Sequence, residues 1–453
     1  MRIGFLPGLD PSWGGVYQYS LTMLSALNDQ SGRGCEDEFI VLTKKKDHPA
    51  LAGLNGRNWT INPLQPVLLP TIQQQAVDLL RKVVGEGPHR EAWRWVRRRW
   101  QRPSRQETPA LPNLDKVQFR PEMNRWFRHC GAELILYPVP ERLSFEAGVP
   151  YIMAIHDLQH RLQPEFPDFS ANGEWERLEY LFRNGSRYAT LLLADSEVGK
   201  EDILNFYGCY GVTPDRVKVL PFLPASYLGV DVPESEQQRI RAGYDLPERY
   251  LFYPAQFWPH KNHGGIVQAL ALLKQEHSIK IPVVFCGSHA PEEIRVRTFH
   301  EVMSLASQLG VIEDIHYLGY APAEDMSGLY AGSVALVMPT FFGPTNIPVL
   351  EAWAFGCPVL TSDIRGVREQ VGDASVLVDP GSVEAIADGI YRLWTDQNLR
   401  CALADRGRRR LASYTPDDYR QRLVEILKEA KARVRSENPR RPKKLSLTKG
   451  KAS

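Results

Sequence analysis

The segment FFGPTNIPVLEAWAFGCPVL, residues 341–360, places one carboxylate, Glu351, in apolar surroundings after a polar turn. Thr345 or Asn346 is suited to cap a helix, and Pro348 suits the first turn of that helix. Free backbone N–H groups at a helix N-terminus bind anions. Glu351 follows one turn later, where its carboxylate can accept hydrogen bonds from hydroxyl groups of the same ligand. The alternative is a solvated glutamate on an ordinary helix.

A lysine lies in a second segment of this kind, AQFWPHKNHGG at residues 255–265. The pattern predicts a strand, a turn and the start of a helix, with Lys261 directly before the helix. An ammonium group in that position can pair with a phosphate alongside the N–H groups of the helix. A solvated surface lysine is the alternative for this segment alone. Together, the two segments indicate a ligand that carries phosphate.

The segment HDLQH, residues 156–160, has histidines at positions i and i+4. This spacing occurs in the zinc motif H-E-x-x-H, but here Asp replaces Glu and a predicted strand leads into the segment. A zinc site is therefore disfavoured. We expect His156 to face a ligand cleft, and a histidine packed in the core is the alternative.

The elements around these segments alternate between strands and helices. The first half contains predicted strands at 2–7, 38–43, 58–64, 132–138, 151–157, 190–196 and 217–222, with helices near 16–27, 173–189 and 197–206. The second half contains predicted strands at 250–256, 281–288, 314–319, 333–339, 358–362 and 375–379. Continuous apolar strands separated by helices indicate parallel sheets. We predict an α/β fold of two Rossmann-like parallel-sheet domains that face a cleft, with ligands beyond the carboxyl ends of the strands.

The domain boundaries follow from breaks in this alternation. Residues 1–229 form the predicted N-terminal domain, which is interrupted by an insert at about 65–120. Residues 230–430 form the predicted C-terminal domain. Residues 431–453 are predicted to be a disordered basic tail, since nine of them are Lys or Arg.

The composition is that of a soluble globular protein, with 43% apolar and 24% charged residues. No apolar run approaches the roughly 18 residues of a membrane span, and Asp10 interrupts the start of the chain before the apolar region of a signal peptide could form. The six cysteines are scattered without a C-x-x-C pair. This pattern suits a reducing cytoplasm, so we expect a cytoplasmic protein.

The predicted insert carries a strongly basic stretch. Residues 81–105 hold nine Lys or Arg and two Glu, and within 91–102 the side chains of Trp93, Val96 and Trp100 fall on one helical face. Basic helices with interfacial tryptophans bind anionic membranes. We predict a peripheral contact of 81–105 with the inner face of the cell membrane; the alternatives are a solvated helix with its tryptophans packed on their own domain, or disorder. Nothing beyond charge supports a nucleic-acid partner, and none is expected.

These motifs together resemble the retaining glycosyltransferases of family 4, which have the GT-B fold. The resemblance covers about residues 1–430 and is most specific in 250–380. It rests on the lysine in PHKNH, on the PVLEAWAFGCPV helix, on the His-Asp pair after a strand and on the SEVGKEDI segment. The resemblance implies that the C-terminal domain binds a nucleotide-sugar, linked to UDP or GDP, and that the N-terminal domain faces the acceptor.

The resemblance also implies roles for single residues. Lys261 would grip the donor diphosphate, and Glu351 would bond the ribose hydroxyls. His156 would contact the transferred sugar near the reaction centre. His156 and Glu351 are therefore the predicted catalytic residues.

The remaining predicted donor-binding residues lie on two loops. Gly14 and Gly15 would let the N-terminal loop approach the donor. Thr345, Asn346 and the backbone amides through Ile347 would hold phosphate and sugar.

Two positions depart from the family pattern. Gly343 replaces the family's first glutamate, eight residues before Glu351, and Thr345 and Asn346 are expected to take over some of its contacts. Gln256 stands where an arginine often supports the phosphate. Gly343 and Gln256 are nonetheless predicted to be donor-binding residues.

The sequence thus predicts a glycosyltransferase of polysaccharide biosynthesis that transfers a hexose, with retention, to a glycan or lipid-linked acceptor. No D-x-D motif occurs, so we expect no obligatory metal and no other cofactor; Lys261 and the helix N-terminus must then neutralise the leaving diphosphate. The usual proposal for this fold is a same-face attack in which the donor phosphate accepts the proton, so we assign no general base. The alternatives are a non-catalytic nucleotide-sugar binding protein and transfer to a small soluble acceptor.

Overall fold

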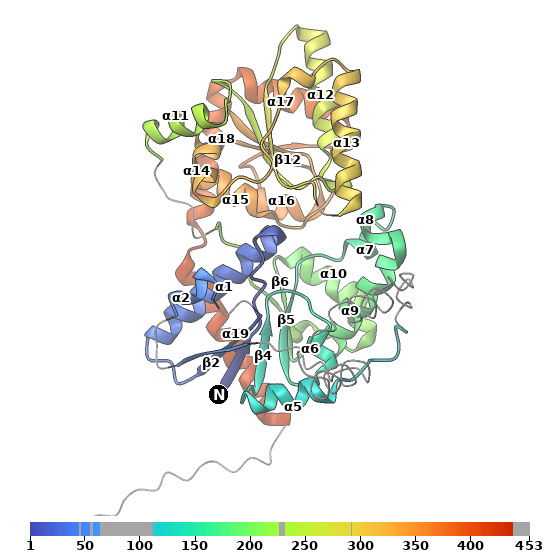
Figure 1. The fold of residues 1–453 in the computed structure, drawn as a ribbon, viewed down its shortest axis with the longest axis vertical. Coiled ribbons are helices and arrows are strands. Elements are labelled where there is room, and N and C mark those ends of the chain that lie inside the picture. Colours follow the sequence, from blue (N-terminus) through green and yellow to red (C-terminus); the bar gives the residue numbers. More distant parts are fainter. Residues whose placement is uncertain are drawn as a thin grey trace, which may run out of the picture.

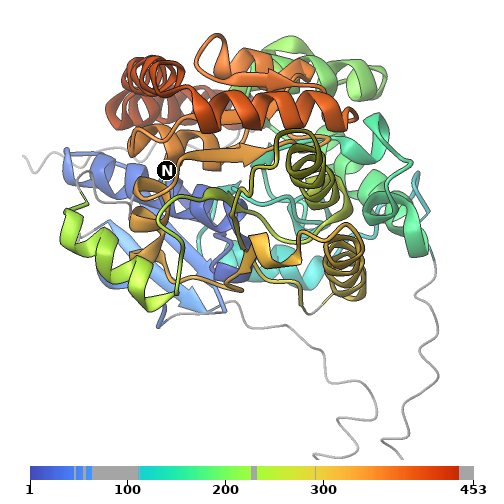
Figure 2. The same ribbon diagram turned by 90° about the horizontal axis from the view of Figure 1, so that it is seen from above.

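The computed structural model describes residues 1–44, 47–54, 58–63, 111, 113–225, 232–290 and 292–437. Two parallel sheets lie one above the other, each with helices on both faces (Figures 1 and 2). The predicted fold of two Rossmann-like domains is confirmed. The basic stretch at 81–105, and with it most of the predicted insert, falls outside the described residues.

The N-terminal sheet has seven strands in the order β3-β2-β1-β4-β5-β6-β7, and every neighbouring pair is parallel. Its strands are β1 (Arg2–Phe5), β2 (Glu38–Thr43), β3 (Trp59–Pro63), β4 (Leu134–Tyr137), β5 (Tyr151–Ile155), β6 (Leu191–Ala194) and β7 (Val217–Val219). Its helices are α1 (Gly15–Gly32), α2 (Pro49–Ala52), α5 (Pro121–His129), α6 (Leu143–Glu146), α7 (Gln159–Leu162), α8 (Pro167–Ser170), α9 (Glu174–Tyr188) and α10 (Glu197–Tyr207).

The C-terminal sheet has six parallel strands in the order β10-β9-β8-β11-β12-β13. Its strands are β8 (Leu251–Pro254), β9 (Val283–Cys286), β10 (Ile315–Tyr317), β11 (Ala335–Met338), β12 (Val359–Ser362) and β13 (Val376–Val378). Its helices are α11 (Glu234–Gly243), α12 (His263–His277), α13 (Glu293–Gln308), α14 (Ala323–Ala331), α15 (Ile347–Ala354), α16 (Arg365–Val371), α17 (Val383–Thr395) and α18 (Gln397–Ala412).

Most of the strands are buried on both faces, which explains why they read as unbroken apolar runs, whereas the edge strands β3 and β10 are more exposed. In β4, for example, Leu134 and Leu136 belong to a core shared with α1, whereas Ile135 and Tyr137 belong to a core shared with α9 and α10. Successive side chains of a strand point to opposite faces of the sheet. All thirteen predicted strands are therefore confirmed, including β2 with its predicted bounds.

The last described helix, α19 (Pro416–Glu437), corrects the predicted C-terminal boundary. It returns to the N-terminal domain, where Tyr419, Leu423 and Val434 lie in the same buried cluster as β1 and α1. Lys431 forms an ion pair with Asp37 on that domain. Residues 416–430 thus pack with the N-terminal sheet, and 431–437 are helical; the prediction that the tail begins at 431 is wrong because one face of this helix is apolar enough to be buried.

The two domains touch along one side of the cleft through α10 and α16. The carboxylate of Glu369 accepts hydrogen bonds from the backbone N–H groups of Glu197 (2.9 Å) and Val198 (3.0 Å) at the start of α10. Arg365 pairs with Asp202 at 2.6 Å. A carboxylate at a helix N-terminus is favoured by the helix dipole, so these contacts fix the facing edges of the two domains.

None of the helices in the described part of the chain has the length and apolar character needed to cross a bilayer.

Candidate active site

A cavity of about 440 Å³ lies between the two domains. It is lined by segments that follow the carboxyl ends of β1, β5, β8 and β11, as expected for ligand sites in parallel sheets. The lining includes every predicted site residue except one: Gly14, Gly15, His156, Gln256, Lys261, Gly343, Thr345, Asn346 and Ile347.

The N-terminus of α15 opens into this cavity without a side-chain cap. Asn346 occupies the N-cap position, but its side chain makes no capping hydrogen bond and instead donates to the Gly343 carbonyl (3.3 Å). The Thr345 hydroxyl is buried and has no hydrogen-bond partner among the described residues. The backbone of Asn346 is fixed by Gln370, which bonds both its N–H and its carbonyl at 2.9 Å. A rigid, uncapped helix start of this kind is suited to an anion.

Lys261 ends the short 3-10 helix at Pro259–Lys261 and is half-buried, with its Nζ 5.8 Å from the centre of the Phe342 ring. Asn262, in the left-handed region at φ 57°, then caps α12 by accepting from the Gly265 N–H. Burial lowers the pKa of Lys261 to about 8, and Asp157 and Asp168 oppose that shift. Across the described ranges, no carboxylate lies within ion-pair distance of this ammonium group. It is therefore available to an anionic ligand.

His156 is held by protein groups at both ring nitrogens. Its Nδ1 lies 3.1 Å from a carboxylate oxygen of Asp195, and its Nε2 lies 2.9 Å from the carbonyl oxygen of Pro138. The Pro138 carbonyl can only accept, so Nε2 donates, and an ionised Asp195 carboxylate favours a second proton on Nδ1. Burial lowers the pKa of His156, but the charge and hydrogen bond of Asp195 together raise it above the usual value. Asp195 thus favours the charged form of His156 at the cavity wall.

Asp195 also lines the cavity and was not predicted. It follows β6 directly, so its position at the end of a parallel strand was the available signal. Burial raises its pKa, whereas His156 lowers it.

We expect Asp195→Asn to lower the pKa of His156, because the amide keeps the shape of the carboxylate and removes its charge. The measurement is an NMR pH titration of the His156 ring. Asp373→Asn, at an exposed position of the C-terminal domain, is the control and should leave that titration unchanged. An unaltered His156 pKa in a folded Asp195→Asn protein would contradict the charged pair.

The second histidine of HDLQH lies in a different environment. His160 is buried beside the Glu179 carboxylate (3.2 Å) and the Tyr207 hydroxyl (3.3 Å). Arg161 pairs with the same carboxylate. His156 and His160 thus have separate partners, and the zinc alternative has no geometric support here.

The backbone conformation of Gly343 explains why a glycine, and not a glutamate, occupies this position. Its φ is +121°, and a Cβ at this position would lie 2.9 Å from Oδ1 of Asn346. The Asn346 side chain therefore fills the space that a side chain at 343 would need. No L-residue fits here without strain.

Replacing Gly343 with Ala should lower the free energy of unfolding by about 1–2 kcal/mol, because the new Cβ meets Asn346 in an unfavourable backbone conformation. Denaturant unfolding measures the change. Gly208→Ala is the matched control, since Gly208 has a φ of −58° and no atom lies within 4 Å of the place that the new methyl group would occupy. Equal effects at the two glycines would show that position 343 is not strained.

Glu351 is the one predicted site residue that does not line the cavity. Its carboxylate is 5% exposed and accepts a hydrogen bond from the Tyr330 hydroxyl at 2.7 Å. Burial raises its pKa to about 7, although the Tyr330 bond acts in the opposite direction. The solvated alternative is therefore wrong. A ribose contact stays a prediction, and a structural bond to Tyr330 is the competing explanation.

Aromatic contacts close the cavity on the side of α8. Phe169 packs against Phe342 and against the His260 ring, at centroid distances of 4.9 and 5.7 Å. Asp168 and His260 form a hydrogen-bonded pair across the two domains. Burial raises the pKa of Asp168 to about 6. These contacts join the loop before Lys261 to the N-terminal domain.

Gln256 has a defined orientation at the cavity wall, because its side-chain oxygen accepts a hydrogen bond from the Trp258 ring N–H at 2.9 Å. A buried arginine lies nearby: the Arg295 guanidinium is 5.2 Å from the centre of the Trp258 ring. This guanidinium is paired with Glu292 on the protein and does not line the cavity.

Comparison with known proteins finds sequence similarity to sugar-transfer enzymes. Residues 234–410 match the family described as glycosyl transferases group 1. The O-antigen chain mannosyltransferase B of Escherichia coli is 29% identical over 263 residues, which cover 55% of this chain and 66% of that protein. A D-inositol 3-phosphate glycosyltransferase of Salinispora arenicola is 28% identical over 258 residues, covering 54% of this chain and 56% of that protein. Each alignment spans less than two thirds of the relative's own length.

Solved structures share the whole architecture. The Anabaena HepE structure in complex with UDP and glucose superposes with a TM-score of 0.65 at 17% identity, covering 94% of this chain and 99% of that one. Such a likeness shows the fold, which is the GT-B arrangement expected from the motifs.

Proposed function

Residues 234–410 match the family described as glycosyl transferases group 1, and we propose on that basis that this protein transfers a sugar from a nucleoside-diphosphate donor to an acceptor. One observation carries the proposal. A half-buried lysine without an ion-pair partner in the described structure, Lys261, borders the same cavity as the uncapped N-terminus of α15. Together they match a diphosphate group.

The charges of the cavity suit the chemistry of a leaving diphosphate. When the bond between the anomeric carbon and the phosphate oxygen breaks, negative charge develops on that oxygen. Lys261, the His156 imidazolium and the N–H groups of α15 stabilise this charge in a site where little water screens it. The acceptor hydroxyl attacks the anomeric carbon on the same face, forms the new glycosidic bond and gives its proton to the departing phosphate. The configuration is thereby retained without a protein nucleophile.

The acceptor that we propose is a glycan or a lipid-linked saccharide. Support comes from the E. coli relative, whose name describes it as an O-antigen chain mannosyltransferase. Transfer to a small soluble acceptor is the second candidate, and the relative named D-inositol 3-phosphate glycosyltransferase favours it.

Donor screening followed by turnover tests this function. UDP-, GDP- and ADP-sugars are first compared for protection against thermal unfolding, and release of the nucleoside diphosphate is then followed with the donor that protects best. We expect protection by one class of donor and slow release that accelerates with acceptor. A non-catalytic binding protein would be protected equally well but would release no diphosphate, even with a range of glycan acceptors.

We also propose that residues 81–105 bind an anionic membrane surface. Trp93→Ala combined with Trp100→Ala should weaken binding to vesicles containing anionic lipid. Each arginine near such a surface contributes about 1 kcal/mol, so charge reversal at 97–99 should also release the protein. Vesicle sedimentation measures both effects, with neutral vesicles as the control. Unchanged sedimentation of both variants would contradict this contact.

A further inference from the structure

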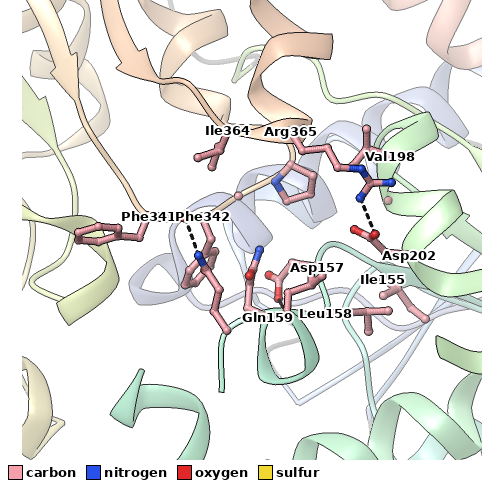
Figure 3. A pocket seen from close by; sticks show the side chains of 16 residues that line it. Ile155, Asp157, Leu158, Gln159, Val198, Asp202, Phe341, Phe342, Ile364 and Arg365 are labelled. Carbon is pink, nitrogen blue, oxygen red and sulfur yellow. Dashed lines mark hydrogen bonds and ion pairs between the residues drawn. The ribbon is translucent and has the colours of Figure 1, made fainter. Parts of the chain in front are cut away.

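A second, smaller chamber adjoins the cavity in the cleft. This side chamber has a volume of about 250 Å³ and lies between α7, α10 and the start of α16 (Figure 3). It shares Asp157, Phe342, Gly343 and Pro344 with the main cavity, so a ligand in one chamber is next to a ligand in the other. Ligand pockets for drug-sized molecules occupy about 300–1,000 Å³, so the side chamber fits a single small ring.

Two glutamines leave polar atoms unsatisfied in this chamber. Gln159 is 5% exposed, and its side-chain oxygen has no hydrogen-bond partner in the described part of the chain. Figure 3 shows its side chain extending from α7 into the chamber, between Phe342 and Asp157 in this view. The side-chain oxygen of Gln163 is likewise buried and unpaired among the described residues, while its amide N–H donates to the Phe341 carbonyl at 3.1 Å. Buried polar atoms are normally hydrogen-bonded, so both oxygens call for a partner that donates.

The charged groups of the chamber already have partners. Arg365 pairs with Asp202 at 2.6 Å across the domain boundary. Asp157 accepts a hydrogen bond from the backbone N–H of Gln159 at 3.2 Å and retains further acceptor capacity. The groups that can still bind a ligand are the side-chain amides of Gln159 and Gln163 and the Asp157 carboxylate, which lie beside the Phe342 ring. They match a neutral ligand with hydroxyl groups, and they do not match a phosphate.

We propose that the side chamber is a subsite for one hexose ring, in which Gln159 and Gln163 recognise ring hydroxyls. This inference rests on the proposed function. The hydroxyls donate to the two amide oxygens, and the Phe342 ring covers an apolar face of the sugar. The ring is either the sugar carried by the donor or a sugar residue of the acceptor, since the chamber borders the reaction cavity. Gln159 and Gln163 are therefore specificity-determining residues for the substrate sugar.

The main test compares Gln159→Leu with the parent protein by calorimetry, using UDP and UDP-glucose and also GDP and GDP-mannose. One lost hydrogen bond should cost about threefold to tenfold in affinity. If the donor sugar occupies the chamber, the nucleotide-sugar binds more weakly while the matching free diphosphate is unaffected. Gln163→Leu should act in the same direction. Gln238→Leu, at an exposed position of α11, is the matched control.

The acceptor arm uses methyl α-D-mannoside and methyl α-D-glucoside as probes. Saturation-transfer NMR in the presence of UDP or GDP should show a bound glycoside whose signal falls in Gln159→Leu, with nucleotide-sugar affinity unchanged. Melting curves report whether each variant is folded, and Gln159→Asn, which keeps an amide, should retain part of the signal if the leucine variant does not fold.

The inference is overturned if folded Gln159→Leu and Gln163→Leu proteins keep both nucleotide-sugar affinity and glycoside signal within twofold of the parent. Failure of the proposed function has a different signature, namely a parent protein that binds no nucleotide. Glycoside binding that depends on Gln159 would then still support the subsite. Absence of both nucleotide and glycoside binding would overturn both proposals.

Discussion

Lys261→Ala is expected to reduce turnover of the nucleotide-sugar by about 10²–10³-fold, the effect of removing one preorganised group that stabilises transition-state charge. The reason is geometric: this half-buried lysine lines the cavity and has no ion-pair partner in the described structure. Binding should change selectively. The variant should bind nucleoside diphosphates more weakly and the free nucleoside almost as well as the parent, because the nucleoside carries no phosphate.

Steady-state kinetics and calorimetry with nucleoside, diphosphate and donor measure these effects. Lys280→Ala, an exposed lysine just before β9 at the opposite edge of the sheet, is the control. The pKa of Lys261 gives a second signature. Since burial lowers it to about 8, the ammonium of the free protein is lost as pH rises through 8, and diphosphate affinity should fall over the same range. Equal loss of nucleoside and diphosphate affinity in Lys261→Ala would place the lysine elsewhere than on the phosphates.

Glu351→Ala is expected to weaken donor, diphosphate and nucleoside alike, by about 10- to 150-fold, if the carboxylate bonds the ribose. All three ligands carry the ribose, which separates this pattern from that of Lys261→Ala. Tyr330→Phe removes the hydroxyl bonded to Glu351 and is the matched control for the structural explanation. A folded Glu351→Ala protein with full nucleoside affinity would eliminate the ribose contact.

The same residue should also make stability depend on pH. Burial raises the pKa of Glu351 to about 7 in the folded protein, whereas an unfolded glutamate titrates near 4.3. Between these values the folded state binds more protons, so this group lowers the free energy of unfolding as pH rises. Glu351→Gln cannot titrate. Its free energy of unfolding, relative to the parent, should therefore increase by about 2–3 kcal/mol from pH 5 to pH 8. Denaturant unfolding at both pH values provides the measurement, and a constant difference would contradict it.

The fold and most of the cavity lining could be predicted because they depend on local patterns. Most strands of both sheets are buried on two faces, so they appear as apolar runs. Residues at the ends of parallel strands gather at one edge of each sheet, and the two domains were predicted to face a cleft. Segments as distant as Gly14 and Asn346 were therefore expected to line the same cleft.

The partners of these residues could not be predicted, since they come from separate segments. Asp195 determines the charge of His156, and Asp168 bonds His260 across the two domains, yet nothing in the local sequence of either pair indicates the other. Glu351 shows a related limit. Its place in an apolar helix was visible, but its burial against Tyr330 depends on how α14 and α15 pack. The path of α19 was missed for the same reason, because an apolar helix face does not specify which sheet will cover it.

The packing of α19 against the N-terminal domain has a consequence for folding during synthesis. The core beneath β1 and α1 includes Tyr419, Leu423 and Ala430, so the N-terminal domain cannot bury its apolar surface until residues 416–437 have been synthesised. Domains of a growing chain usually fold in order, as units, at about 5–20 residues per second of synthesis. Here the C-terminal sheet is complete in sequence by β13, before the helix that finishes the N-terminal one. We therefore expect the C-terminal domain to fold first, although it is translated second. The N-terminal domain keeps part of its apolar core exposed until α19 has been synthesised and packs against it.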